Sequence, residues 1–115
     1  MRYVPINSLG EIKELKKLKR LNLDHCGLQD ISGLENLTEL EELNLWSNSI
    51  SDISPIFNLK KLRILDISYT EITKIKPILE LPNLEELYIM GLSIEDVSDF
   101  SSIKGIKIHT GTYPQ

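Results

Sequence analysis

The segment LNLWSNSISDISPI, residues 43–56, decides how this chain folds. Leu43 and Leu45 are two residues apart, which places both side chains on one face of a short extended segment. The isoleucines that follow are three residues apart, a spacing that fits a tight 3₁₀-like turn. Asp52 precedes this turn, where its carboxylate can accept a hydrogen bond from a free backbone N–H. The segment therefore predicts a strand, a turn and a short helical stretch.

The same pattern recurs every 22 residues along the chain. Seven columns of aliphatic or aromatic residues persist through four consecutive repeats, at repeat positions 1, 4, 7, 9, 14, 17 and 20. Position 7 is Leu21, Leu43, Leu65 and Leu87, and position 9 is Leu23, Leu45, Ile67 and Ile89. One repeat cannot bury its own apolar face, so neighbouring repeats are expected to stack around a shared core and a parallel sheet.

These repeats resemble the leucine-rich repeats, and among them the 22-residue bacterial type of the internalins. The resemblance covers residues 15–102 as four full repeats, and residues 1–14 fit the back half of a preceding, partial repeat. It implies an α/β solenoid with a short parallel sheet on its concave face and 3₁₀ or irregular segments on its convex face. Residues 103–115 slip from the 22-residue register and are predicted to form a terminal edge strand and a tail.

The chain departs from the family pattern in ways that bear on its location. The family's buried asparagine at position 12 survives only as Asn48, and the single cysteine, Cys26, excludes an internal disulfide. Neither a secretion signal nor a stretch apolar enough to cross a bilayer is recognisable. These features favour a cytoplasmic protein that does not bind membranes, or a secreted one if the chain is a fragment of a larger surface protein.

The strand positions that point away from the core predict a binding face. Position 8 lies between two buried leucines and points outward, positions 6 and 10 join it, and position 11 lies at the rim. Large apolar and aromatic side chains on an otherwise polar face are typical of interaction sites. The predicted partner contacts are Trp46, Tyr88, Met90, Ile64, Tyr69, Asn44, Asp66 and His25.

Two readings of the exposed aromatic residues remain open at this point. In the first, Trp46 and Met90 flank the small Ser68, two strand spacings apart, and form the walls of a shallow socket for a partner. In the second, Trp46 and Tyr88 simply cover neighbouring strands, since isolated exposed hydrophobic residues are common.

Charges at the start of each repeat alternate in sign from one repeat to the next. Lysines and Arg20 in the first repeat are followed by Glu39, Glu41 and Glu42 in the second, and this order then repeats. Stacking sets opposite charges side by side, which helps to fix the register. With a net charge of −4 and no aromatic residues among the lysines, the sequence does not favour a nucleic-acid partner.

The residue types needed for catalysis are not assembled in a convincing way. His25 and Cys26 are adjacent, but successive side chains of an extended segment point to opposite faces. The two histidines are separated by almost the whole stack, so no shared metal site is expected, and no phosphate-binding motif implies a cofactor.

The sequence therefore predicts a non-catalytic module that binds a protein partner on its concave face. Two alternatives remain: a structural solenoid that forms a homodimer through its ends, and an inhibitor or immunity-type protein. The second is a special case of partner binding, in which an acidic face meets a basic target.

Overall fold

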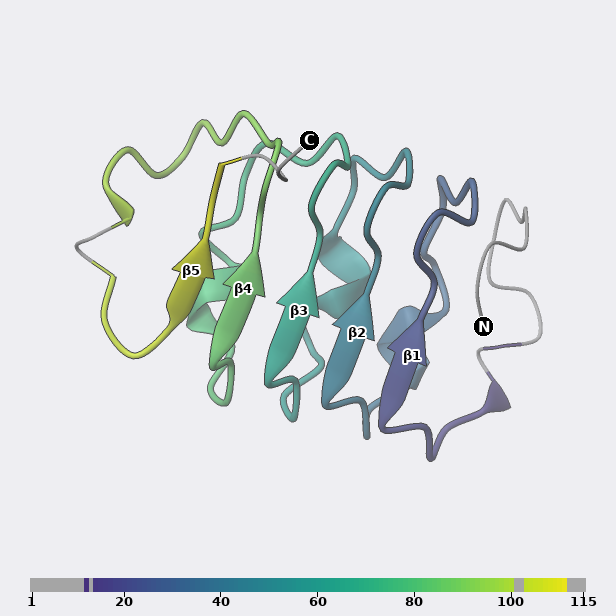
Figure 1. Cartoon of the computed structure of the whole chain (residues 1–115). Helices are drawn as coiled ribbons and strands as arrows, with labels where there is room; N and C mark the ends of the chain where they lie inside the picture. Colours follow the sequence, from purple (N-terminus) through teal and green to yellow (C-terminus); the bar gives the residue numbers. More distant parts are fainter. Residues whose placement is uncertain (1–11, 13, 101–102, 112–115) are drawn as a thin grey trace.

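The computed structural model describes residue 12, residues 14–100 and residues 103–111. Within them, five short strands form one parallel sheet in chain order: β1 (Arg20–Asn22), β2 (Glu42–Asn44), β3 (Ile64–Asp66), β4 (Glu86–Tyr88) and β5 (Lys107–His109). The 3₁₀ helices η2 (Leu34–Asn36), η3 (Ser54–Ile56) and η4 (Ile78–Glu80) lie behind the sheet (Figure 1). The predicted solenoid is confirmed. The expected partial repeat before residue 15 lies almost wholly outside the described residues, as does the end of the tail.

The strands pair in the register that the repeat predicts. Leu43 of β2 lies opposite Leu21 of β1 and Leu65 of β3, each one repeat away. The last pair differs, because Leu87 of β4 lies opposite Ile108 and not opposite His109, which is 22 residues after Leu87. The last turn is therefore one residue shorter than the others, although its strand still adds to the sheet.

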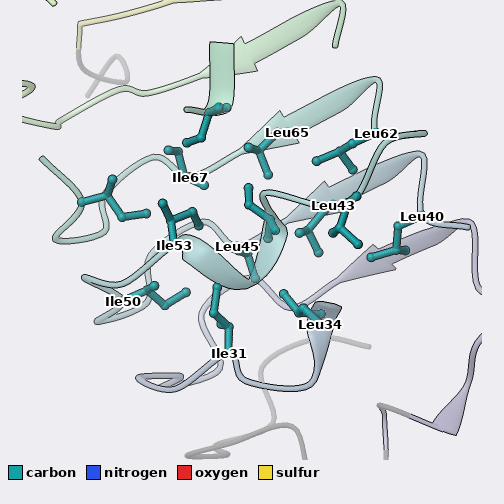
Figure 2. Packing of buried hydrophobic residues seen from close by; sticks show 14 of the residues in the cluster. Ile31, Leu34, Leu40, Leu43, Leu45, Ile50, Ile53, Leu62, Leu65 and Ile67 are labelled. Atoms are coloured by element: carbon teal, nitrogen blue, oxygen red, sulfur yellow. The ribbon is translucent and has the colours of Figure 1, made fainter. Parts of the chain in front are cut away.

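The core lies between the sheet and the convex segments. Figure 2 shows strand leucines such as Leu43 and Leu65 in one cluster with Ile53 and other buried side chains. These side chains are almost completely buried, at 2% exposure for Leu43 and 0% for Leu65. Each such burial stabilises the fold by about 1.5–3 kcal/mol, so the stacked columns supply the main driving force for folding.

Asn48 connects the first two repeats through the core. Its side-chain Oδ1 accepts hydrogen bonds from the backbone N–H groups of Cys26, at 3.0 Å, and Leu28, at 2.9 Å. Its Nδ2 donates to the backbone carbonyls of Leu23 and Leu45, both at 2.9 Å. One side chain thus satisfies four backbone groups at the bend that follows the strands.

Aspartates at position 16 support the turns of the convex side. Asp30 and Asp52 each accept a hydrogen bond from the backbone N–H two residues later, at 2.9 and 3.0 Å. The third repeat carries Lys74 at this position and cannot make the bond. There, Asp96 of the following repeat accepts from the N–H groups of Ile75 and Lys76, at 3.0 and 2.9 Å. A neighbouring repeat therefore supplies the acceptor that the third repeat lacks.

The alternating charges form ion pairs between neighbouring repeats. Lys61 Nζ lies 2.8 Å from Glu39 Oε1, and Arg63 Nε lies 3.4 Å from Glu85 Oε2. The Lys61–Glu39 contact lowers the pKa of the Glu39 carboxyl and raises the pKa of the Lys61 amine. Because these groups are exposed to solvent, they adjust the register of the stack and contribute little to its stability.

Candidate functional site

A shallow groove of about 470 Å³ crosses the face of the sheet. It contains four of the eight residues that the sequence predicts as partner contacts: Asn44, Ile64, Asp66 and Tyr88. They come from three consecutive strands, β2 to β4, which lie side by side in Figure 1. All four side chains are half-buried, so each keeps part of its surface open to the groove. The other four predicted contacts lie beyond the carboxyl ends of the strands.

The polar side chains at position 8 also hold the backbone in place. Asn22, Asn44 and Asp66 each use Oδ1 to accept a hydrogen bond from the N–H two residues later, at 3.0, 2.9 and 2.9 Å. Such a bond fixes both the side chain and the bend that follows the strand. The groove is therefore lined by oriented polar groups. Asn22 and Asn44 use their only side-chain oxygen in the fold, whereas Asp66 uses one of its two.

Tyr88 occupies position 8 in the fourth repeat and has no oxygen that can make this bond. Ser68 of the preceding repeat supplies the acceptor instead, and its Oγ accepts a hydrogen bond from the backbone N–H of Met90 at 2.9 Å. Ser68 is completely buried as a result. The prediction of an open socket at Ser68, between Trp46 and Met90, is therefore wrong: Ser68 is a structural link between repeats.

Three of the remaining predicted contacts form an aromatic rim at the ends of the strands. The ring of Trp46 lies 6.1 Å from that of His25 and 6.2 Å from that of Tyr69, the latter edge-on at 83°. His25 Nδ1 also lies 2.9 Å from Ser47 Oγ. The rim of His25, Trp46 and Tyr69 is thus a packed cluster in which the Trp46 side chain is only partly exposed.

An unusual backbone conformation at position 11 directs these rim side chains. His25, Ser47 and Tyr69 have φ values of 57°, 61° and 57°, and Gly91 at the same position has φ 76°. Residues other than glycine rarely adopt this left-handed region. A Cβ atom at Gly91 would overlap Cδ1 and Cε1 of Tyr69, so the ring of Tyr69 packs directly on the glycine. The repeat therefore sets both the conformation and the position of the rim.

His109 packs against the groove residue Tyr88, although the sequence did not single it out as a contact. Its ring stacks on that of Tyr88 with the centroids 4.1 Å apart and the planes 7° apart, and its Nε2 lies 3.3 Å from Glu86 Oε2. The register slip of the last strand brings His109 opposite Tyr88. A pairing that continued at 22 residues would have placed a different residue there, so the sequence offered no direct signal.

Burial and charge shift the pKa of two groove residues. Burial raises the pKa of the Asp66 carboxyl, although hydrogen bonds from the backbone and side chain of Ser68 oppose this effect. The negative charge of Asp24 also raises this pKa, and His109 lowers it. Burial also raises the pKa of the Tyr88 hydroxyl, and the carboxylates of Glu86 and Asp66 act in the same direction. Asp66 is therefore a carboxylate held in an environment that does not favour its charge.

The described residues do not assemble a metal centre, and the Cys26 thiol does not contact His25. Within them, no group of three or more His, Cys, Asp or Glu side chains is arranged to hold a metal ion. The Cys26 thiol is completely buried, with Sγ 3.5 Å from the carbonyl oxygen of Asp24, whereas His25 contacts Ser47. In the part of the chain that the structure describes, no helix is long and apolar enough to span a membrane.

Comparison with known structures relates the stack to internalins. The chain matches internalin C2 from Listeria monocytogenes with a TM-score of 0.76 and 24% identity, over 94% of this chain and 57% of that one. It matches the ectodomain of the receptor kinase SOBIR1 from Arabidopsis thaliana with a TM-score of 0.71 and 22% identity, over 97% and 67%. The match to an internalin, inlF, from Listeria monocytogenes has a TM-score of 0.56 and 24% identity, and it covers 96% of this chain and 45% of that one. The chain thus spans little more than half of internalin C2.

Comparison with curated protein sequences gives no match. The family model for leucine-rich repeats in pairs matches three overlapping stretches, residues 16–58, 38–77 and 60–102. Proteins with such repeats generally mediate protein–protein interactions, and those like internalins are typically non-catalytic. The matched stretches together cover most of the chain, which therefore belongs to the leucine-rich-repeat family, and its fold is similar to that of the internalins.

Proposed function

We propose that this chain is a non-catalytic interaction module that binds a segment of a protein partner in the groove across its sheet. The observation that carries the proposal is the groove itself, in which Ile64 and Tyr88 are partly exposed among oriented polar groups. Apolar and aromatic anchors surrounded by polar groups are the composition of protein-binding sites. The aromatic rim would extend the contact, with Trp46 as its largest side chain and Met90 beside it.

The groove also suits a partner because its walls are already rigid. The side chains of Asn44 and Asp66 are fixed by backbone hydrogen bonds, and Tyr88 is fixed by its stack on His109. A preorganised surface loses little conformational entropy on binding, which raises the affinity obtained from a given contact area.

The test compares an aromatic residue of the groove with one on the opposite side. A photo-crosslinking amino acid placed at Tyr88 should capture the partner, and the same amino acid at Phe57, which follows η3 on the convex side, should not. With the captured partner in hand, Tyr88→Ala should weaken binding by about 30-fold, equivalent to about 2 kcal/mol. Phe57→Ala is the matched control and should leave the affinity unchanged. Capture through Phe57 alone, or equal affinities for both variants, would remove the sheet face as the binding site.

A second candidate is self-association through the end of the stack. Ile94, Val97 and Phe100 of the fourth repeat are only half-buried, although the same columns are fully buried in the second repeat. They line a hollow of about 400 Å³ beside Leu92, which another copy of the chain would cover. Light scattering at rising concentration measures the mass, and Val97→Lys should return any dimer to a monomer. A chain that stays monomeric at high concentration excludes this mode.

A further inference from the structure

Asp66 is the exception among the position-8 residues that support the backbone. Asn22, Asn44 and Asp66 all make the same hydrogen bond, from Oδ1 to the N–H two residues later, with lengths between 2.9 and 3.0 Å. Two of the three make it with an uncharged amide. The negative charge of Asp66 is therefore not needed for the support of the bend, and its presence calls for another reason.

The charge also stands where the fold gives it little compensation. Asp66 is half-buried, and the nearby carboxylate of Asp24 disfavours its ionised form. Within the described residues, Arg20 pairs with Glu42, and Arg63 pairs with glutamates of the two neighbouring repeats, so neither arginine forms an ion pair with Asp66. The hydrogen bonds from Ser68 and the attraction of His109 favour the ionised form, but burial outweighs them and the pKa of the Asp66 carboxyl stays raised. A cation supplied from outside would offset this cost of burial.

The ring of Tyr88 lies next to this carboxylate. Asp66 and Tyr88 are direct partners on β3 and β4. His109 of β5 stacks in parallel on one face of the ring, with the centroids 4.1 Å apart. Because β5 lies on the far side of β4 from β3, the other face of the ring is turned toward Asp66. The groove therefore presents an aromatic face and a carboxylate side by side, with Ile64 as the apolar neighbour.

We infer that the Asp66–Tyr88 pair receives an arginine side chain of the protein partner, an inference that rests on the proposed use of the groove. A planar guanidinium can lie over an aromatic face while its N–H groups donate to a neighbouring carboxylate. Arginine suits this combination better than lysine, because its flat, delocalised cation stacks and its donors are fixed in one plane. The methylene groups of the arginine would lie along Ile64.

Of the other carboxylates around the groove, Glu42 and Glu86 are already engaged and Asp24 does not line it, which makes Asp66 the specific receptor. Glu42 lies 3.9 Å from both Arg20 and Arg63, and Glu86 lies 3.3 Å from His109. A partner's arginine would have to displace one of these contacts to reach Glu42 or Glu86. At Asp66 it displaces none of them and shares the carboxylate only with the hydrogen bonds from Ser68.

The test uses the full chain and two short peptides that differ only in charge. The probe is acetyl-Gly-Arg-Gly-amide, and its control is the same peptide with citrulline, which replaces the guanidinium by a neutral urea of the same shape. Titration is followed by the amide and ring NMR signals of Asp66 and Tyr88. We expect saturable shifts with the arginine peptide and none with the citrulline peptide.

The variants Asp66→Asn and Asp52→Asn complete the test. Each removes one negative charge and keeps an oxygen for the same kind of backbone hydrogen bond, but Asp52 lies on the exposed convex side. Asp66→Asn should weaken binding of the arginine peptide by about tenfold or more, and Asp52→Asn should leave it unchanged.

Several outcomes would overturn the inference: no shifts at Asp66 up to about 50 mM peptide, equal shifts with citrulline, or equal losses in the two variants. The last result would mean that the peptide responds to net charge alone. Because this test uses only the peptides, its failure is separate from that of the proposed function. A partner captured through Tyr88 whose affinity does not change in Asp66→Asn would leave the groove as the binding site and exclude the arginine contact.

Discussion

Asn48→Ala is the substitution whose effect follows most directly from the structure. Asn48 is 5% exposed and is buried between the first and second repeats. Its Oδ1 accepts from the N–H groups of Cys26 and Leu28, and its Nδ2 donates to the carbonyls of Leu23 and Leu45. Alanine removes all four partners at once and leaves a small space in their midst.

The cost can be worked out from the two donors. A buried N–H that loses its acceptor costs about 1–3 kcal/mol, so the loss at Cys26 and Leu28 gives about 2–6 kcal/mol. The carbonyls add less, because a water molecule in the vacated space can donate to them and can accept from one N–H. We therefore expect Asn48→Ala to lower the free energy of unfolding by about 3 kcal/mol, and by no less than 2 kcal/mol.

Urea unfolding followed by circular dichroism measures this change. With a denaturant dependence of about 1.5 kcal/mol/M, a loss of 3 kcal/mol moves the midpoint down by about 2 M. The matched control is Asn83→Ala, which removes an exposed asparagine whose Nδ2 donates to the carbonyl of Lys60 at 2.8 Å. This control should change the stability by less than about 0.5 kcal/mol. Equal midpoints for the two variants would refute the reasoning, because they would mean that burial of the Asn48 network adds nothing to its strength.

Three further predictions test the core, the groove and the rim. Leu43→Ala removes a strand leucine that is 2% exposed and should cost about 2–5 kcal/mol by urea unfolding; a loss under 1 kcal/mol would contradict a close-packed column. Asp66→Asn should stabilise the fold at neutral pH, because the pKa of the Asp66 carboxyl is raised in the folded state and the fold therefore loses stability as the pH rises above the ordinary value of 3.8. Thermal melts should show the gain in stability at pH 7 and its loss near pH 3. A variant that is less stable than the wild type at pH 7 would count against the raised pKa. Gly91→Ala should lower the melting temperature more than Gly27→Ala, because both glycines have a positive φ but only a Cβ at Gly91 overlaps the ring of Tyr69. Equal melting temperatures would mean that the ring moves aside without cost.

The strands and the core could be predicted from sequence because the repeat is regular. When Leu21, Leu43, Leu65 and Leu87 recur at one spacing, the backbone around them must recur as well, and the two-residue alternation then fixes which side chains point inward. The same reasoning located Asn44, Ile64, Asp66 and Tyr88 on the outer face, where the structure assembles them in one groove.

The finer structure of the site depends on contacts that a periodic pattern does not encode. Ser68 looked like an open outward position, but the absence of an acceptor at Tyr88 draws it into a hydrogen bond with the next repeat. His109 reaches Tyr88 only because the last turn is one residue short. The left-handed backbone that directs Tyr69 had one trace in the sequence, the glycine at the same position of the fourth repeat.

The departures from the repeat therefore carry the functional information. A residue that recurs at its position is explained by stacking, as Asn22 and Asn44 are by the backbone hydrogen bond that they share. A residue that differs from its counterparts, and gives the fold no added stability, needs a reason outside the fold. Asp66 meets both conditions, because it keeps the shared hydrogen bond and adds a charge that its surroundings disfavour. If natural proteins retain such costs mainly where function requires them, the pair of measurements on Asp66→Asn, greater stability and weaker binding, should move in opposite directions.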